Sequence, residues 1–425
     1  MSSRSETRHD GFLLTRRALG RSLALGTVGA ALWPDAAAQA MQAMQGRRQR
    51  PSDAELKALI RIGANENPYG VGPAAAEAIR QNIVAANRYP GELTMTLTST
   101  LAKFHDVPMD WIALSPGSGD VLRSVTMTFT SPTKHLVGAA PTFEAPGRIA
   151  EMLGVPVKAP KVLANGQLDL KAMAGQAAGA GLMYVCNPNN PTGSIVSSAA
   201  VADFVAQVRK VNPDAYVLID EAYSDLVDDP GFASATPLIA NDKKIIVSRT
   251  FSKIHGMAGL RVGYAIAQPE TLNILKKNLS MGNLAVTSLA AANASMNDTE
   301  NMKKQKQLNR DTRAATRAAF EKAGFTVLPS EANFIMVDIK RDVREYQSAC
   351  RQAGVMIARP FPPLDTYARI TIGTVDEMAK ATPIMVSLLQ ANAHPTSARG
   401  ASRRVDEPLI VAANMGEVPG YPACC

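Results

Sequence analysis

Short apolar runs alternate with longer amphipathic segments from about Ile62 to Ala391. Each short run is rich in β-branched residues and ends beside polar or turn residues, which predicts a strand. Strands that alternate with helices are typical of an α/β protein with a mostly parallel sheet. The predicted strands are His135–Gly138, Leu182–Cys186, Tyr216–Ile219, Ile245–Ser248, Phe334–Val337 and Arg369–Ile372.

Two of the intervening helices have recognisable ends. Ser198 can cap a helix whose core-facing stripe is Val201, Phe204, Val205 and Val208. The last helix opens on a capping box, Thr374 to Glu377, and Pro383 predicts that it kinks or restarts there.

The pattern divides the chain into five parts, with a second α/β unit beginning after about Met281. We expect a leader over 1–40, an N-terminal arm over 41–80 and a large domain over 81–285. A smaller C-terminal α/β domain over 286–392 and a flexible tail over 393–425, rich in Ser, Arg, Gly and Pro, complete it.

Composition and charge narrow the functional classes. The chain has 425 residues, 46% of them hydrophobic and 19% charged, with four cysteines, so it is neither disordered nor a disulfide scaffold. Its net charge of +8 is uneven: +2 over 1–40, +3 over 41–50, zero from 393 onward, and only +3 over 51–392. A nearly neutral body of that size argues against a nucleic-acid partner.

The N-terminus has the layout of an export signal. Arg16-Arg17 precedes an uncharged, largely apolar run of 13 residues, Ser22–Pro34, and small residues follow at Ala36–Ala40. The adjacent arginines resemble a twin-arginine signal, although an ordinary signal can contain such a pair by chance. We expect cleavage after Ala38 or Ala40, a periplasmic or exported protein, and no membrane anchor, because the run is too short to span a bilayer.

Four motifs fall at or just beyond the carboxyl ends of predicted strands, where open α/β sheets bind ligands. Gly117–Asp120 precedes a helix and is either an anion-binding turn or only a turn. Asn187–Gly193 reads by itself as a rigid loop. Asp220–Tyr223 carries an acid that is either solvated or directed into a site. The fourth motif is Thr250–Gly256 with Gly259–Arg261, where Lys253 is an exposed cation or, if desolvated, a nucleophilic amine.

In this order the motifs resemble those of the class I/II, fold-type I aminotransferases. Further segments are similar to the histidinol-phosphate aminotransferase branch, and the resemblance spans about Ile62 to Ala391. Those segments are Asn65–Gly70, Arg88–Pro90, Ser330–Phe334 and Ala368–Gly373.

The resemblance implies pyridoxal phosphate as cofactor, bound by the large domain. Lys253 matches the Schiff-base lysine and general base, and Asp220 matches the acid that pairs with the ring nitrogen. Tyr223 and Asn190 match donors to the ring's phenolic oxygen. Phe143 matches the ring-stacking aromatic, with ordinary core packing as the alternative.

Further matches concern phosphate and substrate. The cofactor's phosphate would meet Ser118, Gly119, Thr250, Ser252, Arg261 and, from a neighbouring subunit of a homodimer, Tyr89. Arg369 matches the arginine for the substrate α-carboxylate, a task suited to guanidinium geometry, with Asn333 assisting. Tyr69 and Arg359 are candidates for the far end of the substrate, and no metal ligands are expected.

Some positions depart from the family pattern. Gly91 stands where an acid usually follows Arg-Tyr-Pro, and Ser118–Asp120 is an unusual phosphate turn. The expected activity is transfer of an amino group from an L-amino acid or amino-alcohol phosphate to a 2-oxo acid. Two alternatives stay open: a lyase or decarboxylase of an amino-acid phosphate, which shares these motifs, and a non-catalytic periplasmic binding protein.

Overall fold

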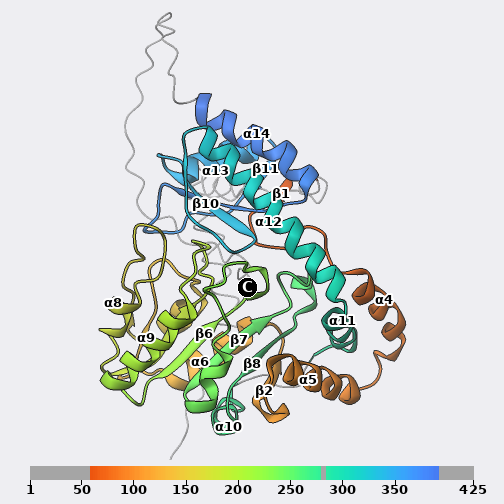
Figure 1. Ribbon diagram of the computed structural model, residues 1–425, viewed down its shortest axis with the longest axis vertical. Helices are drawn as coiled ribbons and strands as arrows, with labels where there is room; N and C mark the ends of the chain where they lie inside the picture. The colour runs from red at the N-terminus through yellow and green to blue at the C-terminus, as the bar shows by residue number, and fades with distance from the viewer. Residues whose placement is uncertain (1–57, 279–283, 392–425) are drawn as a thin grey trace, which may run out of the picture. The chain divides into compact units, whose positions relative to one another are not determined.

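The computed structural model describes residues 58–278 and 284–391. The proposed export signal, most of the arm and the tail lie outside the described residues. The described chain forms three sheets (Figure 1). The largest has seven strands in the order β2 (Ile112–Ser115), β8 (Gly263–Ile266), β7 (Ile245–Thr250), β6 (Tyr216–Asp220), β5 (Ala180–Cys186), β3 (His135–Val137) and β4 (Val157–Lys158).

This large sheet is parallel except at β8, which runs antiparallel to both of its neighbours. It therefore confirms the expected fold class, a mostly parallel sheet between helices. The helices assigned before residue 298 are α4 (Pro73–Asn82), α5 (Gly91–His105), α6 (Ser118–Phe129), α7 (Ala145–Met152), α8 (Leu170–Ala174), α9 (Ser198–Val211), α10 (Pro269–Leu275) and α11 (Val286–Asn297).

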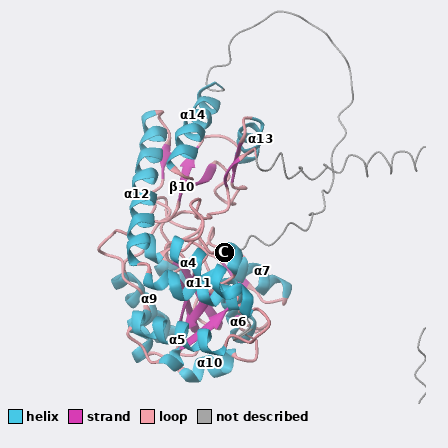
Figure 2. Ribbon diagram, turned by 90° about the vertical axis from the view of Figure 1, so that its right-hand side faces the viewer, coloured by secondary structure: helices cyan, strands magenta, loops and turns pink. Residues whose placement is uncertain are grey.

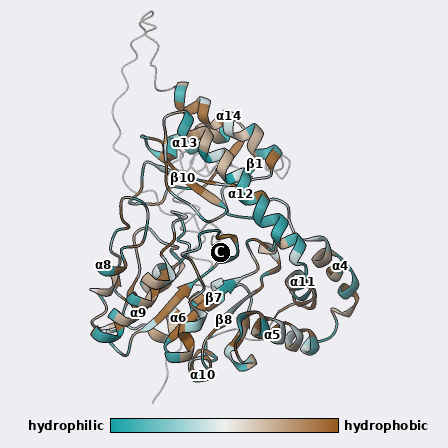
Figure 3. Cartoon of the chain, viewed as in Figure 1, coloured by the Kyte–Doolittle hydropathy of each residue, from teal (hydrophilic) through white to brown (hydrophobic). Residues whose placement is uncertain are grey.

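Both faces of the sheet are buried, because successive side chains of a strand point to opposite faces. In β6, Val217 and Ile219 pack into a core with α9 and α11, whereas Leu218 packs into a second core with α6 and α10. Figure 3 shows the strands around β6 as hydrophobic and α12 (Thr299–Lys322) as mostly hydrophilic. Double-sided burial explains why these strands are continuous apolar runs.

The remaining sheets are smaller. A three-stranded antiparallel sheet has the order β12 (Tyr367–Thr371), β10 (Phe334–Asp338) and β9 (Thr326–Val327). A two-stranded parallel sheet pairs β1 (Ile60–Ile62) with β11 (Val355–Ile357), so the start of the described chain joins a C-terminal core. The helices α13 (Val343–Gln352) and α14 (Val375–Ala391) pack beside these sheets together with α12 (Figure 2).

The six predicted strands are all present, with ends that differ by at most two residues. The capping box is also confirmed, because the Glu377 N–H donates to Thr374 Oγ1 (3.1 Å) and the Thr374 N–H donates to Glu377 Oε2 (2.8 Å). The helix does not restart at Pro383: α14 continues through it to Ala391. Buried residues on both sides of the proline, Met378 and Met385, keep the two halves on one core.

The cap of α9 is Ser197, not Ser198 as its sequence predicts. Ser197 Oγ accepts a hydrogen bond from the Ala200 N–H (3.2 Å), whereas Ser198 Oγ donates to the Gly231 carbonyl (3.3 Å). Two adjacent serines can each cap the same apolar stripe, so the pattern could not distinguish them.

The Ser197→Ala variant should therefore lower the free energy of unfolding by about 1 kcal/mol, the usual cost of removing an N-cap. Ser198→Ala, the matched control, should change it by less than about 0.5 kcal/mol. Urea unfolding of both variants measures this difference, and equal losses would contradict the assignment of the cap.

Among the described helices, none combines the length and apolar composition needed to cross a membrane.

Candidate active site

The carboxyl ends of β5, β6 and β7 lie side by side and carry three of the motifs. Asp220 is the last residue of β6, and Thr250 is the last residue of β7. The loop over 187–193 follows β5, and its fold is fixed by side chains: Asn189 Nδ2 donates to Thr192 Oγ1 (2.9 Å). Parallel pairing therefore brings to one sheet edge residues that lie tens of positions apart in sequence.

Asp220 is the most distinctive group at this edge. It is 2% exposed, and its Oδ2 accepts a hydrogen bond from the Tyr184 hydroxyl (3.0 Å). Burial raises the pKa of the Asp220 carboxyl to about 7, opposed by the Tyr184 hydrogen bond and by Lys253. Within the described chain, its Oδ1 is buried without a hydrogen-bond partner. A buried acceptor of this kind calls for a donor that the protein itself does not supply.

Lys253 and Tyr223 lie next to Asn65. Lys253 Nζ donates to the Asn65 carbonyl (3.2 Å) and lies 5.4 Å from the centroid of the Tyr223 ring. The Tyr223 hydroxyl accepts from Asn65 Nδ2 (3.0 Å), and burial raises the pKa of this phenol, so it stays protonated at neutral pH. All three residues are buried, which removes Lys253 from the class of exposed loop cations.

Asn65 also connects this group to the C-terminal sheets. Its side-chain carbonyl accepts from Thr371 Oγ1 (2.9 Å), and its backbone carbonyl accepts from Asn333 Nδ2 (3.0 Å). Asn65 has a φ of 55°, which asparagine adopts more readily than most residues. The sequence motif containing Asn65 was recognisable, but its central position in the site was not.

Arg369 lies on β12 and faces the same region. Its two terminal nitrogens donate to Asn190 Oδ1 (2.6 Å) and to the Gly63 carbonyl (2.8 Å). Its Nε is buried without a hydrogen-bond partner among the described residues. Burial lowers the pKa of the Arg369 guanidinium to about 10, so the group remains a cation at neutral pH. It is therefore a buried positive charge whose Nε–H still lacks an acceptor in the described chain, and each terminal nitrogen keeps a second N–H.

Hydroxyl groups cluster around Ser252, the residue before Lys253. Thr250 Oγ1 donates to Ser252 Oγ (2.9 Å), and Arg261 contacts the same Ser252 oxygen (3.4 Å). A side chain at Gly117 would come within 2.2 Å of Arg261 Nη2, so glycine is needed where this guanidinium meets the turn. The Ser118 hydroxyl, in the first turn of α6, is buried and has no partner in the described chain. Such a cluster suits an anion.

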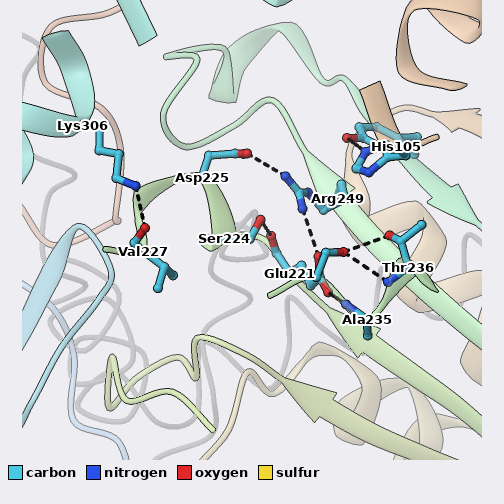
Figure 4. A network of polar contacts seen from close by, with 11 residues as sticks. His105, Glu221, Ser224, Asp225, Val227, Ala235, Thr236, Arg249 and Lys306 are labelled. Carbon is cyan, nitrogen blue, oxygen red and sulfur yellow. Dashed lines mark hydrogen bonds and ion pairs between the residues drawn. The ribbon is translucent and has the colours of Figure 1, made fainter. Parts of the chain in front are cut away.

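A buried ionic network fixes the strand ends behind the site (Figure 4). Arg249 donates to Glu221 (2.9 Å) and Asp225 (2.6 Å), and Glu221 also accepts from the Ala235 N–H (2.7 Å). Glu221 follows Asp220, and Arg249 precedes Thr250, so this pair ties the end of β6 to the end of β7. Both Glu221 oxygens are occupied, which identifies it as a structural acid.

Other predicted residues lie at the margins. Tyr69 lines a small cavity together with Lys253 and Asn333, and its hydroxyl accepts from the Val375 N–H (3.3 Å). Phe143 is partly buried against the core that contains Tyr184. Gly119 is half-buried beside Ser118.

Two predicted residues are not part of the central group. Tyr89 is fully exposed, and its expected role towards another subunit stays a prediction. Arg359 is ion-paired with Glu144, a residue for which no role was predicted.

Comparisons with known proteins agree with this arrangement. Residues 57–382 match the family model for aminotransferase class I and II. A histidinol-phosphate aminotransferase of Symbiobacterium thermophilum is 36% identical over 328 residues, covering 76% of this chain and 88% of the relative. An aromatic amino acid aminotransferase of Thermobifida fusca is 32% identical, covering 75% and 87%.

A solved structure shows the same fold. The histidinol-phosphate aminotransferase of Sinorhizobium meliloti, in complex with pyridoxal-5'-phosphate, has a TM-score of 0.74 and 23% identity, covering 82% of this chain and 97% of that one. The chain therefore belongs to the class I and II aminotransferases, and it is a pyridoxal phosphate-dependent aminotransferase.

Proposed function

We propose that Lys253, Asp220, Tyr223 and Arg369 carry out the transfer of an amino group from an L-amino acid or amino-alcohol phosphate to a 2-oxo acid. The observation that carries the proposal is the buried Asp220 carboxyl, with an unpartnered oxygen, in the same buried site as Lys253. The ordered motifs and the shared Asn65 contacts support the assignment.

The residues present fit pyridoxal phosphate. Among the described residues, neither Asp220 Oδ1 nor Ser118 Oγ has a hydrogen-bond partner, so the first could accept from a ring N–H and the second could donate to a phosphate oxygen. Arg261, Thr250 and Ser252 would supply charge and hydroxyls to the same phosphate. When bound, the cofactor supplies a carbonyl carbon that combines with amines and a ring that withdraws electrons.

The chain's own groups then have separate tasks. Lys253 Nζ would remove the proton from the donor's Cα. In the half-reaction with the 2-oxo acid it would return a proton to the Cα of the acceptor, so it acts as a general acid–base group. The Tyr223 hydroxyl, protonated at neutral pH, and Asn190 would donate to the phenolic oxygen of the cofactor. The depth of the site keeps water away from these hydrogen bonds, which strengthens them.

Arg369 would bind the α-carboxylate of an amino acid or oxo acid. Its geometry allows two parallel hydrogen bonds to a carboxylate, and its charge is already buried. Asn333, with a buried unpartnered Oδ1, lies on the neighbouring segment and would assist.

Arg369→Lys should therefore raise KM for a carboxylate-bearing donor by about 10- to 100-fold, because one point charge replaces a bidentate contact. Its kcat should fall less. Steady-state kinetics with two donors, one with and one without an α-carboxylate, measures the effect. Equal losses for both donors would contradict the carboxylate role.

Two further proposals concern the whole protein. The exposed Tyr89 would complete the phosphate site of a second subunit, so we propose a homodimer, which sedimentation at several concentrations tests. The Arg16-Arg17 pair and the small residues after it support export through a twin-arginine signal and a periplasmic location. Replacing both arginines with lysines should leave the precursor uncleaved in a fractionated cell.

The test of the function is direct. The purified protein with added cofactor is incubated with a panel of amino donors and 2-oxoglutarate, and new glutamate and carbon dioxide are measured. We expect glutamate to form with at least one donor. Carbon dioxide release without glutamate would contradict amino transfer and indicate a decarboxylase instead.

A further inference from the structure

Arg359 lies close to the proposed carboxylate site. The guanidinium carbon of Arg359 is 4.3 Å from the centroid of the Phe361 ring, and that of Arg369 is 4.5 Å from the same centroid. Charge repulsion from Arg359 also contributes to the lowered pKa of Arg369, after burial. The two cations therefore share one aromatic ring, which places Arg359 beside the group that would hold the donor's α-carboxylate.

Arg359 is not available as a free anion site. Its Nη2 is ion-paired with Glu144, and its Nη1 donates to the Pro360 carbonyl (2.8 Å). Glu144 follows Phe143 and stands at the N-cap position of α7, where its side chain makes no capping hydrogen bond and is left to pair with arginines. The same carboxylate pairs with Arg148 one turn along the helix (2.9 Å).

The cavity at this place is balanced in charge. It measures about 350 Å³, and the charged residues that line it are Glu144, Glu151, Arg148 and Arg359, with a formal sum of zero. Its other walls are apolar, and they include Leu136, Ala139, Val157, Phe361 and Pro362. A phosphate monoester placed here would approach Glu144 and would have to displace it from Arg359.

We propose that Glu144 is a specificity-determining positioning residue, which holds and neutralises Arg359 so that the donor is an L-amino acid with an α-carboxylate and not an amino-alcohol phosphate. The proposal rests on the proposed function, because it takes Arg369 as the α-carboxylate site. Discrimination here comes from repulsion of the wrong substrate as much as from contacts with the right one. The Glu144 and Arg359 side chains are partly exposed, to 30% and 40%. The effect of this ion pair on specificity should therefore be moderate and should weaken with salt.

The test compares the holoenzyme with its Glu144→Gln variant. The matched control is Glu151→Gln, which removes a like charge from the same cavity wall and for which no contact with Arg359 is assigned. The donors are L-phenylalanine and histidinol phosphate, with 2-oxoglutarate as acceptor. Calorimetric titration with histidinol phosphate adds a readout that does not depend on turnover.

We expect the original protein to have the higher kcat/KM for L-phenylalanine. Glu144→Gln should lower KM and Kd for histidinol phosphate about 10-fold, with kcat for L-phenylalanine changed less than about two-fold. Glu151→Gln should leave the preference nearly unchanged.

Other outcomes overturn the inference. A preference of the original protein for histidinol phosphate would show that Glu144 does not exclude phosphate. An equal rise in KM for both donors in Glu144→Gln would show that Glu144 only supports the fold. Amino transfer with a phosphorylated donor alone leaves the proposed function intact, whereas no transfer with any donor contradicts that function.

Discussion

The Lys253→Ala variant should lose amino transfer by a factor on the order of 10³ or more while keeping its fold. The loss follows because the same nitrogen would bind the cofactor and move the substrate proton. The fold should survive, since the Asn65 carbonyl that accepts from Lys253 Nζ also accepts from Asn333 Nδ2 (3.0 Å). Initial rates of glutamate formation measure the activity, and circular dichroism checks the fold.

A covalent readout separates this role from a merely structural one. Borohydride reduction of the holoenzyme should add the cofactor's mass to Lys253 in the original protein and not in the variant. Lys303→Ala is the control: its side chain is 74% exposed and pairs with Glu300 at the surface, which contributes little. Retention of full turnover by Lys253→Ala would refute the mechanism.

The strand-end residues were predictable because the fold constrains them strongly. Asp220 and Thr250 end strands that begin with apolar runs and are buried on both faces of the sheet, and such runs can be recognised in a sequence. Parallel pairing then brings their ends together whatever the length of chain between them. The fold class and the meeting of these strand ends follow from local patterns, whereas the roles of the residues there were implied by the resemblance to the family.

Contacts between residues that are far apart in sequence but close in space were not predictable. Asn65 meets residues 158 and 306 positions away, and nothing near it in the chain indicates those partners. Tyr184 reads as an ordinary core residue, although its hydroxyl meets Asp220. Glu144 is one acid beside a helix until the fold places Arg359 against it. Pairings of this kind depend on how separate cores dock, which periodicity does not encode.

Asp220→Asn should lower kcat/KM by about 10²- to 10³-fold. A carboxylate paired with a charged ring nitrogen is worth a few kcal/mol at the effective dielectric of a protein, and an amide cannot make that charge pair. The variant keeps an oxygen that can accept from Tyr184, so the site should not collapse. Steady-state kinetics with a saturating cofactor concentration measures the loss.

The same substitution should stabilise the cofactor-free protein at high pH. Burial raises the pKa of the Asp220 carboxyl from 3.8 to about 7, so the folded state holds a proton that the unfolded state releases between those values. The stability that this carboxyl contributes is therefore complete below about pH 4 and is lost as the pH rises through about 7. An asparagine does not ionise, and the variant escapes this loss.

The Tm of cofactor-free Asp220→Asn relative to that of the cofactor-free original protein should thus rise by a few degrees between pH 5 and pH 8. Asp214→Asn is the control, because the hydrogen bond to Lys244 lowers the pKa of that exposed carboxyl and it stays ionised over this range. Its difference from the original protein should not grow with pH. A Tm difference for Asp220→Asn that is independent of pH would mean that the carboxyl is already ionised at pH 5. Ionised Asp220 therefore lowers the stability of the cofactor-free protein at the pH where the enzyme needs its charge. Such a cost is expected of a residue that binds a cofactor and not of an acid that only supports the core.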